Sequence, residues 1–125
     1  MIKTIILTIA FLSFSNISMA KDLYRGPSAG DKGEYYVLEN KKIGDGLFQV
    51  LSSRIGKGNA YTDFTELKIN CKTKQYFELA GGEEDGVKDK PSKELKDWSK
   101  QSKWTSLVNG SSKSDLVEYV CMKKK

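Results

Sequence analysis

Two cysteines, Cys71 and Cys121, constrain the fold of this chain more than any other feature. Cys71 ends a segment in which the apolar residues Leu67 and Ile69 alternate with polar ones. This period of two is typical of a half-buried strand. Cys121 ends an apolar stripe at helical spacing, formed by Leu116, Val117 and Val120. A bond between the cysteines would therefore fasten a C-terminal helix to the inner face of a sheet.

The first twenty residues indicate that the chain is exported. Lys3 is followed by an apolar run, residues 5–14, and then by the small-x-small sequence Ser18-Met19-Ala20, which is the pattern of a cleavable signal peptide. The run is too short to span a bilayer. A buried N-terminal helix or strand is the alternative, but the run shows neither periodicity. We expect cleavage after Ala20, a periplasmic or secreted protein and, since no lipidation cysteine follows, no stable membrane anchor.

Export makes a Cys71–Cys121 disulfide the expected state of the two thiols, because an even cysteine count in a small exported domain is typical of a bridge. The bridge would close a loop of about 50 residues and stabilise the fold by about 4 kcal/mol on the chain-entropy model. A catalytic thiol is the alternative, but the chain has no histidine to activate one.

Length and charge limit the possible organisation and partners. Of the 125 residues, 20 are in the predicted signal peptide, and the remaining 105 fit a single domain. Loss of Lys3 lowers the net charge from +5 to +4. Because both signs are mixed along the chain and the only purely basic cluster is 123–125, we expect a solvated surface and no nucleic-acid partner.

The remaining pattern predicts an α+β fold with an antiparallel sheet of about 4–6 strands packed against the C-terminal helix. Residues 21–33 are predicted to be a mobile arm and residues 34–125 the folded domain. Within the domain we expect an exposed loop at 81–91, whereas the pattern of 92–103 is ambiguous and permits a short helix. Ser112 and Asp115 resemble a capping box at the start of the last helix. The strands are expected at 34–38, 47–55, 61–71 and 75–80.

The sequence offers little catalytic chemistry, and we expect no enzyme, cofactor or metal site. The absence of histidine excludes Ser-His-Asp and Cys-His sites and most catalytic zinc sites. The segments Gly44-Asp45-Gly46 and Gly56-Lys57-Gly58 fit turns better than phosphate loops. Acidic residues at 83–85, with Asp89, have the carboxylates that Ca²⁺ prefers, but they lack EF-hand spacing and favour a solvated loop.

Aromatic residues are the best candidates for function. The neighbours Tyr35 and Tyr36, like the neighbours Tyr76 and Phe77, must point to opposite faces of their strands. Either one of each pair is available to a protein partner, or a helix or loop covers the second face. Because interface hot spots favour aromatic residues beside basic ones, we predict a protein-binding surface. Its candidate residues are Tyr36, Tyr76, Trp98, Lys72 and Lys74.

Elements spread over most of the chain resemble the surface-adhesin protein E family of exported bacterial proteins. They begin with Tyr35-Tyr36-Val37 and Ile43, a glycine turn at Gly46 and the strand 48–51. They continue with Tyr61, Leu67, Ile69-Asn70-Cys71, the strand 75–79, Trp104, Val108, Gly110-Ser111 and Val120-Cys121. The resemblance lies in the order and spacing of these elements.

This resemblance implies an antiparallel sheet against a helix, homodimer formation and binding to host matrix or serum proteins. This chain departs from the family in two ways that concern function. Members of the family are presented as outer-membrane lipoproteins, whereas no lipidation cysteine follows Ala20 here, and Asn109 stands where a proline is expected. We therefore expect a non-enzymatic exported protein-binding domain, whose partner is a host protein or an envelope protein. A soluble periplasmic inhibitor or immunity protein, or an accessory subunit of a secretion system, is the alternative.

Overall fold

A computed structural model describes residues 17–123 of the chain. It contains an antiparallel sheet, two short 3₁₀ turns and one α-helix, so the predicted fold class is confirmed. The strands are β1 (Ile17–Arg25), β2 (Glu34–Gly44), β3 (Leu47–Ile55), β4 (Tyr61–Asn70), β5 (Gln75–Asp85), β6 (Lys96–Asp97) and β7 (Thr105–Ser106). The 3₁₀ turns are η2 (Pro27–Ala29) and η3 (Lys57–Asn59), and the helix is α1 (Ser112–Lys123).

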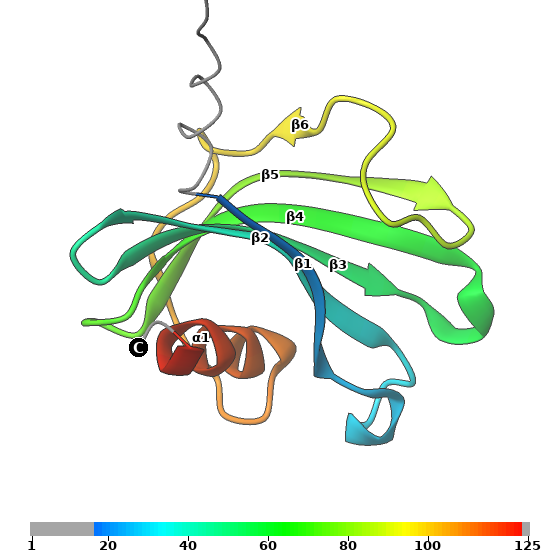
Figure 1. The fold of residues 1–125 in the computed structure, drawn as a ribbon, viewed down its shortest axis with the longest axis horizontal. Coiled ribbons are helices and arrows are strands. Elements are labelled where there is room, and N and C mark those ends of the chain that lie inside the picture. The colour runs from blue at the N-terminus through cyan, green and yellow to red at the C-terminus, as the bar shows by residue number, and fades with distance from the viewer. Residues whose placement is uncertain (1–16, 124–125) are drawn as a thin grey trace, which may run out of the picture.

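The sheet follows chain order, with β1 to β6 side by side and β7 also paired to β5. Its long strands arch over α1, so one face of the sheet is concave and holds the helix (Figure 1). We call this the helix face and the opposite side the outer face. The core lies between the helix face and α1, and its buried members are Val37, Phe48, Val50, Leu67, Ile69, Leu116, Val117, Val120 and Cys121.

The disulfide joins the sheet to the helix as the two apolar patterns predicted. Cys71, directly after β4, is bonded to Cys121 on α1 with a Cα–Cα distance of 5.6 Å. Leu67 and Ile69 on the strand are fully buried, as are the apolar residues of the helical stripe. Because disulfides persist in oxidising compartments, the bond indicates an extracytoplasmic environment. Among the described residues, no helix is long and apolar enough to cross a membrane.

The residue that caps the N-terminus of the helix lies one position earlier than the sequence predicted. The hydroxyl of Ser111, rather than of Ser112, accepts a hydrogen bond from the amide of Ser114 (3.1 Å). Asp115 lies in the first turn, where its carboxylate accepts a 2.9 Å hydrogen bond from Arg25. Asp115, which the sequence predicted to be part of the cap, therefore links the helix to β1 through Arg25.

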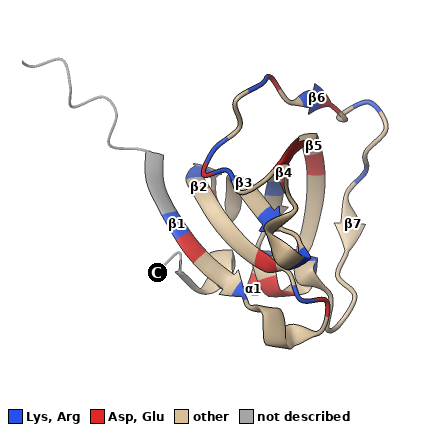
Figure 2. Ribbon diagram, turned by 90° about the vertical axis from the view of Figure 1, so that its right-hand side faces the viewer, with Lys and Arg blue, Asp and Glu red and all other residues tan. Residues whose placement is uncertain are grey.

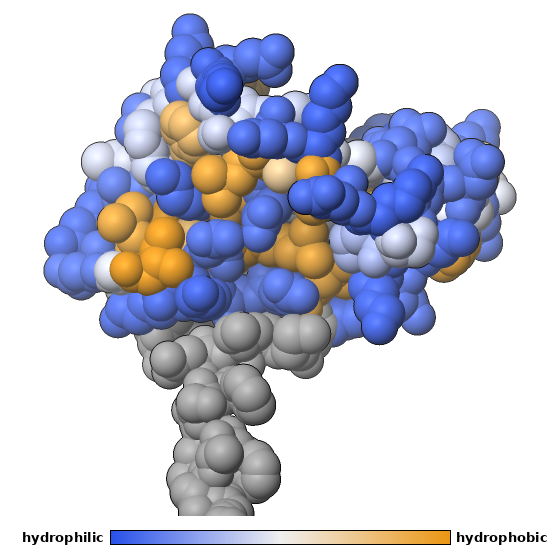
Figure 3. All heavy atoms as spheres, turned by 90° about the horizontal axis from the view of Figure 1, so that it is seen from above, coloured by the Kyte–Doolittle hydropathy of each residue, from blue (hydrophilic) through white to orange (hydrophobic). Residues whose placement is uncertain are grey.

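The outer face has a small apolar cluster of its own. Leu38, Leu51 and Phe64 are buried there, and Leu95 from the segment before β6 packs against them. Tyr35 is buried, while Tyr36 packs at the edge of the outer cluster. Seen from this side, apolar patches lie between hydrophilic side chains (Figure 3). A loop thus covers part of the outer face of the sheet. This was one of the two alternatives for the adjacent aromatic residues, the other being that one residue of each pair is available to a partner.

The prediction that residues 21–33 form a mobile arm is wrong for residues 21–25. Residues 21–25 belong to β1, and Tyr24 packs against the core. An edge strand is held by backbone hydrogen bonds to its neighbour, so it forms without a strong apolar pattern of its own. The predicted signal peptide lies mostly outside the described residues, although the backbone of 17–20 extends β1.

Three further boundaries differ from the prediction, and the first is that β2 continues to Gly44 instead of ending at residue 38. The loop expected at 81–91 begins later, because β5 continues to Asp85 with Gly81–Asp85 paired to Tyr61–Thr65 of β4. Glycine and charged residues have low β-propensity, so the pairing with β4 decides the outcome. No helix forms over 92–103; this segment contains β6 and a turn. Basic and acidic residues are interspersed along the visible elements (Figure 2).

Candidate functional site

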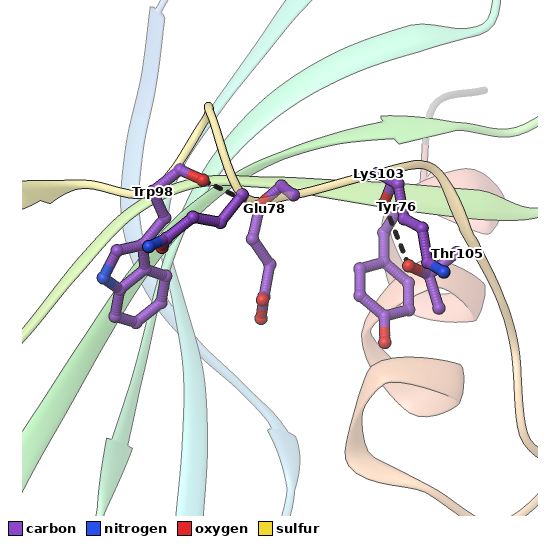
Figure 4. Close-up of a pocket in the computed structure, with 7 residues that line it drawn as sticks. Tyr76, Glu78, Trp98, Lys103 and Thr105 are labelled. Carbon is purple, nitrogen blue, oxygen red and sulfur yellow. Dashed lines mark hydrogen bonds between the residues drawn. The ribbon is translucent and has the colours of Figure 1, made fainter.

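An open pocket of about 440 Å³ lies beside β5, where the segment 98–105 passes along the edge of the sheet. Its lining residues are Tyr76, Glu78, Trp98, Gln101, Ser102, Lys103 and Thr105. Figure 4 shows the side chains of Tyr76, Glu78 and Trp98 pointing to the same side of the sheet, with Glu78 between the two rings. This volume falls within the range of small-molecule sites, and we call the feature the aromatic pocket.

A glycine on β5 allows Trp98 to lie where it does. A Cβ built on Gly81 would lie 2.1 Å from Cη2 of the Trp98 ring, so only glycine leaves room for the indole. The backbone fixes the same residue, because the Trp98 amide donates to the Leu79 carbonyl (2.8 Å). The amides of Gln101 and Ser102 donate to the Trp98 carbonyl at 3.0 and 3.1 Å. The sequence thus folds the segment after β6 into a turn that anchors one wall of the pocket.

The opposite wall is formed by Tyr76 and Glu78 together with a cation from the helix. The Lys113 ammonium lies 3.5 Å from Glu78 Oε2 and 5.6 Å from the centre of the Tyr76 ring. Burial, and then the negative charge of Glu78, raise the pKa of Tyr76, so its hydroxyl is a neutral donor at physiological pH. This wall therefore contains one aromatic ring, one carboxylate and one phenolic hydroxyl.

A second, smaller hollow of about 150 Å³ lies beyond Lys113 on the helix face. It is lined by Tyr24, Tyr35, Ser52, Ser53, Arg54, Asp63, Thr65, Ser112 and Lys113. Arg54 donates to the hydroxyls of Tyr35 (2.9 Å) and Tyr61, and the Tyr35 hydroxyl donates to Asp31. The hydrogen bond from Tyr35, and then one from the Gly33 amide, lower the pKa of Asp31. Because these groups bond mainly to one another, this network organises the fold around β2 and β3.

The structure brings two of the five predicted binding residues together. Tyr76 and Trp98 line the same pocket although 22 positions separate them in the sequence. Tyr36 belongs to the outer cluster, where its hydroxyl donates to Glu34 (2.9 Å). Lys72 and Lys74 lie in the exposed turn between β4 and β5, with Lys72 paired to Asp45 at 2.7 Å. These three lie apart from the pocket, and a binding role for any of the five stays a prediction.

The acidic residues considered for a cation lie in separate surroundings. Glu84 accepts two hydrogen bonds from Ser92, at 2.8 and 2.7 Å, and Asp89 pairs with Lys21 at 2.7 Å. Glu83 faces Asp63 across β4 and β5, and the hydrogen bond with Asp63, followed by its charge, raises the pKa of Glu83. Within residues 17–123, no group of three or more metal-ligating side chains is placed to hold an ion.

Sequence reasoning missed most of the pocket and one other aromatic cluster. Strand alternation could have placed Glu78 on the same face as Tyr76, but the residues after Trp98 carry no periodic signal, and their position beside Glu78 depends on β6 and β7 pairing with β5. Near the outer face, Phe77 and Trp104 lie 5.6 Å apart with the Lys68 ammonium over both rings. Alternation along β5 could have placed Phe77 opposite Tyr76, but not its contact with Trp104.

Comparison with protein-family models, with curated proteins and with solved structures finds no match to this chain.

Proposed function

We propose that this chain is an exported, non-enzymatic protein-binding domain of the bacterial envelope, of the same type as surface adhesin E. Its partner docks on the aromatic pocket, where Tyr76 and Trp98 provide the main contacts. The partner is a host matrix or serum protein, or another protein of the envelope.

The observation that carries this proposal is the convergence of Tyr76 and Trp98 on one open pocket. Tyrosine and tryptophan are enriched among interface residues whose truncation costs most binding energy, because they contribute a large rigid contact area and a polar group. The pocket also supplies hydrogen-bonding side chains around the two rings, including Glu78, Gln101 and Thr105. A concave site with aromatic walls and a few polar groups is suited to holding a projecting side chain of a partner.

The extracytoplasmic environment indicated by the disulfide is consistent with the rest of the proposal. We infer that the signal peptide is removed after Ala20 and that the mature domain is released into the periplasm or the medium. The absence of a lipidation cysteine after Ala20 supports a released protein rather than one anchored at the surface.

Affinity capture with the mature domain tests this function. The wild-type domain is expected to retain a specific protein, and Trp98→Ala or Tyr76→Ala should reduce the captured amount at least about tenfold. Tyr36→Ala is the matched control, since it removes a tyrosine from the outer face. Equal capture by the wild type and the Trp98→Ala variant would contradict the proposal. A captured hydrolase would identify the domain as an inhibitor instead.

A further inference from the structure

The position of Glu78 gives the aromatic pocket a defined chemical preference. Its carboxylate lies between the rings of Tyr76 and Trp98 (Figure 4). An aromatic face attracts cations through its quadrupole, and a carboxylate attracts them through its charge. The three groups together favour a positively charged group in the space that they enclose.

Lys113 shows that a cation already uses one side of this arrangement. Its ammonium contacts both Glu78 and the Tyr76 ring from the side of the smaller hollow, at 3.5 and 5.6 Å. A strong charge-assisted hydrogen bond is about 2.7–2.9 Å long, so the Lys113–Glu78 pair is a loose one. The Glu78 side chain keeps 36% of its surface exposed and can accept a second donor from the aromatic pocket.

Nearby charge on the same face supports this preference. Glu83 stands two residues after Gly81, which lies beneath Trp98, and faces Asp63 across the strands. The hydrogen bond with Asp63, and then its charge, raise the pKa of Glu83, which is the effect of one carboxylate close to another. Glu78 and Glu83 thus place two carboxylates on β5, one on either side of the Gly81 position beneath Trp98.

We propose that the aromatic pocket receives a basic side chain, a lysine ammonium or an arginine guanidinium, from the protein partner. The incoming cation packs between Tyr76 and Trp98 and pairs with Glu78 in competition with Lys113. This inference rests on the proposed function and names the chemistry of the partner. Lys103 also lines the pocket, so it is a second internal competitor.

The test measures the fluorescence of Trp98 as the only tryptophan, in a mature Trp104→Phe background. The probe is a hexa-arginine peptide, and a hexaglutamate peptide of equal length reports the opposite preference. We expect the arginine peptide to bind, Glu78→Gln to weaken it about tenfold, and Lys113→Met to strengthen it about threefold. Glu66→Gln is the matched carboxylate control, because Glu66 pairs with Gln49 away from the pocket.

Tighter binding of hexaglutamate, or weaker binding of hexa-arginine to the Lys113→Met variant, would overturn the inference. Circular dichroism and thermal unfolding of each variant show whether the fold is kept. The partner captured by the wild-type domain separates this inference from the proposed function. Capture that depends on Trp98 but is unaffected by Glu78→Gln contradicts the basic side chain alone, whereas capture that ignores Trp98 contradicts the docking site itself.

Discussion

Trp98 lies directly over Gly81, so close that a Cβ on the glycine would fall 2.1 Å from the indole ring. The next residue, Gly82, has room for a methyl group, since its nearest neighbour, Leu95 Cδ2, would lie 3.4 Å away. Two adjacent glycines on β5 thus differ in what they allow. Gly81 is required by the position of Trp98, and through it by the aromatic pocket.

Replacement of Gly81 by alanine is expected to displace the Trp98 ring. Overpacking of this kind lowers the free energy of unfolding by about 1–3 kcal/mol. Gly82→Ala should change it little, because the added methyl makes an ordinary contact. Urea unfolding, followed by circular dichroism and by Trp98 fluorescence in a Trp104→Phe background, measures both effects. Equal stability of the two alanine variants would show that Trp98 does not pack on Gly81.

The disulfide should be a major contribution to stability. Replacing Cys71 and Cys121 together with serine opens a bridge that spans 50 positions, and we expect the free energy of unfolding to fall by about 4 kcal/mol. Reduction of the wild-type domain should have a similar effect. Equilibrium unfolding with and without reductant measures it. If the oxidised protein labels at two free thiols, the bridge is absent and the account of the fold is wrong.

Replacing the neighbouring residues Glu83 and Glu84 of β5 by glutamine should change the stability of the fold in opposite directions. Hydrogen bonds from the Ser92 hydroxyl and amide lower the pKa of Glu84, so this carboxylate stabilises the fold above its unfolded pKa of about 4.3. That contribution disappears as the pH falls through the lowered pKa of the folded state. Glu84→Gln is therefore expected to lower Tm at pH 7 and to have a smaller effect near pH 3.

Glu83 has the reverse shift, because Asp63 raises its pKa. A carboxyl group with a raised pKa stabilises the fold when protonated, and this contribution is lost as the pH rises through the pKa of the folded state. Glu83→Gln is expected to raise Tm at pH 7, and the gain should vanish in acid, where wild-type Glu83 is protonated too. Thermal unfolding from pH 3 to 8 tests both variants. A lower Tm for Glu83→Gln at pH 7 would be inconsistent with repulsion between Glu83 and Asp63.

Processing at the predicted site would alter the edge of the sheet. Backbone pairing joins Ile17–Met19 to Glu39–Lys41, and a register shift separates this part of β1 from the part after Asp22. Cleavage after Ala20 removes the first part, so amide exchange at Glu39–Lys41 should be faster in the mature protein than in the precursor. Mass spectrometry of exported protein is expected to find Lys21 as its first residue. A mature chain that retains Ile17–Ala20 would show that cleavage occurs elsewhere.

Local patterns predicted the core because each core element carries its own signal. The alternation ending at Cys71 and the helical stripe ending at Cys121 identified the two buried faces, and the bond between them followed from export. The extension of β5 from Gly81 onward and the pairing of residues 21–25 were missed, since both depend on a neighbouring strand. Trp98 was identified by its residue type, whereas its contact with Gly81 depends on the path of a segment that has no periodicity.

The most direct test of the account is whether a partner touches Trp98. The chain has two tryptophans, so Trp104→Phe leaves Trp98 as the only one and Trp98→Phe leaves Trp104 as the only one. Titration with the captured partner should change the emission of the variant that keeps Trp98 and leave that of the variant that keeps Trp104 almost unchanged. A change confined to the variant that keeps Trp104 would move the binding surface away from the aromatic pocket and contradict the account.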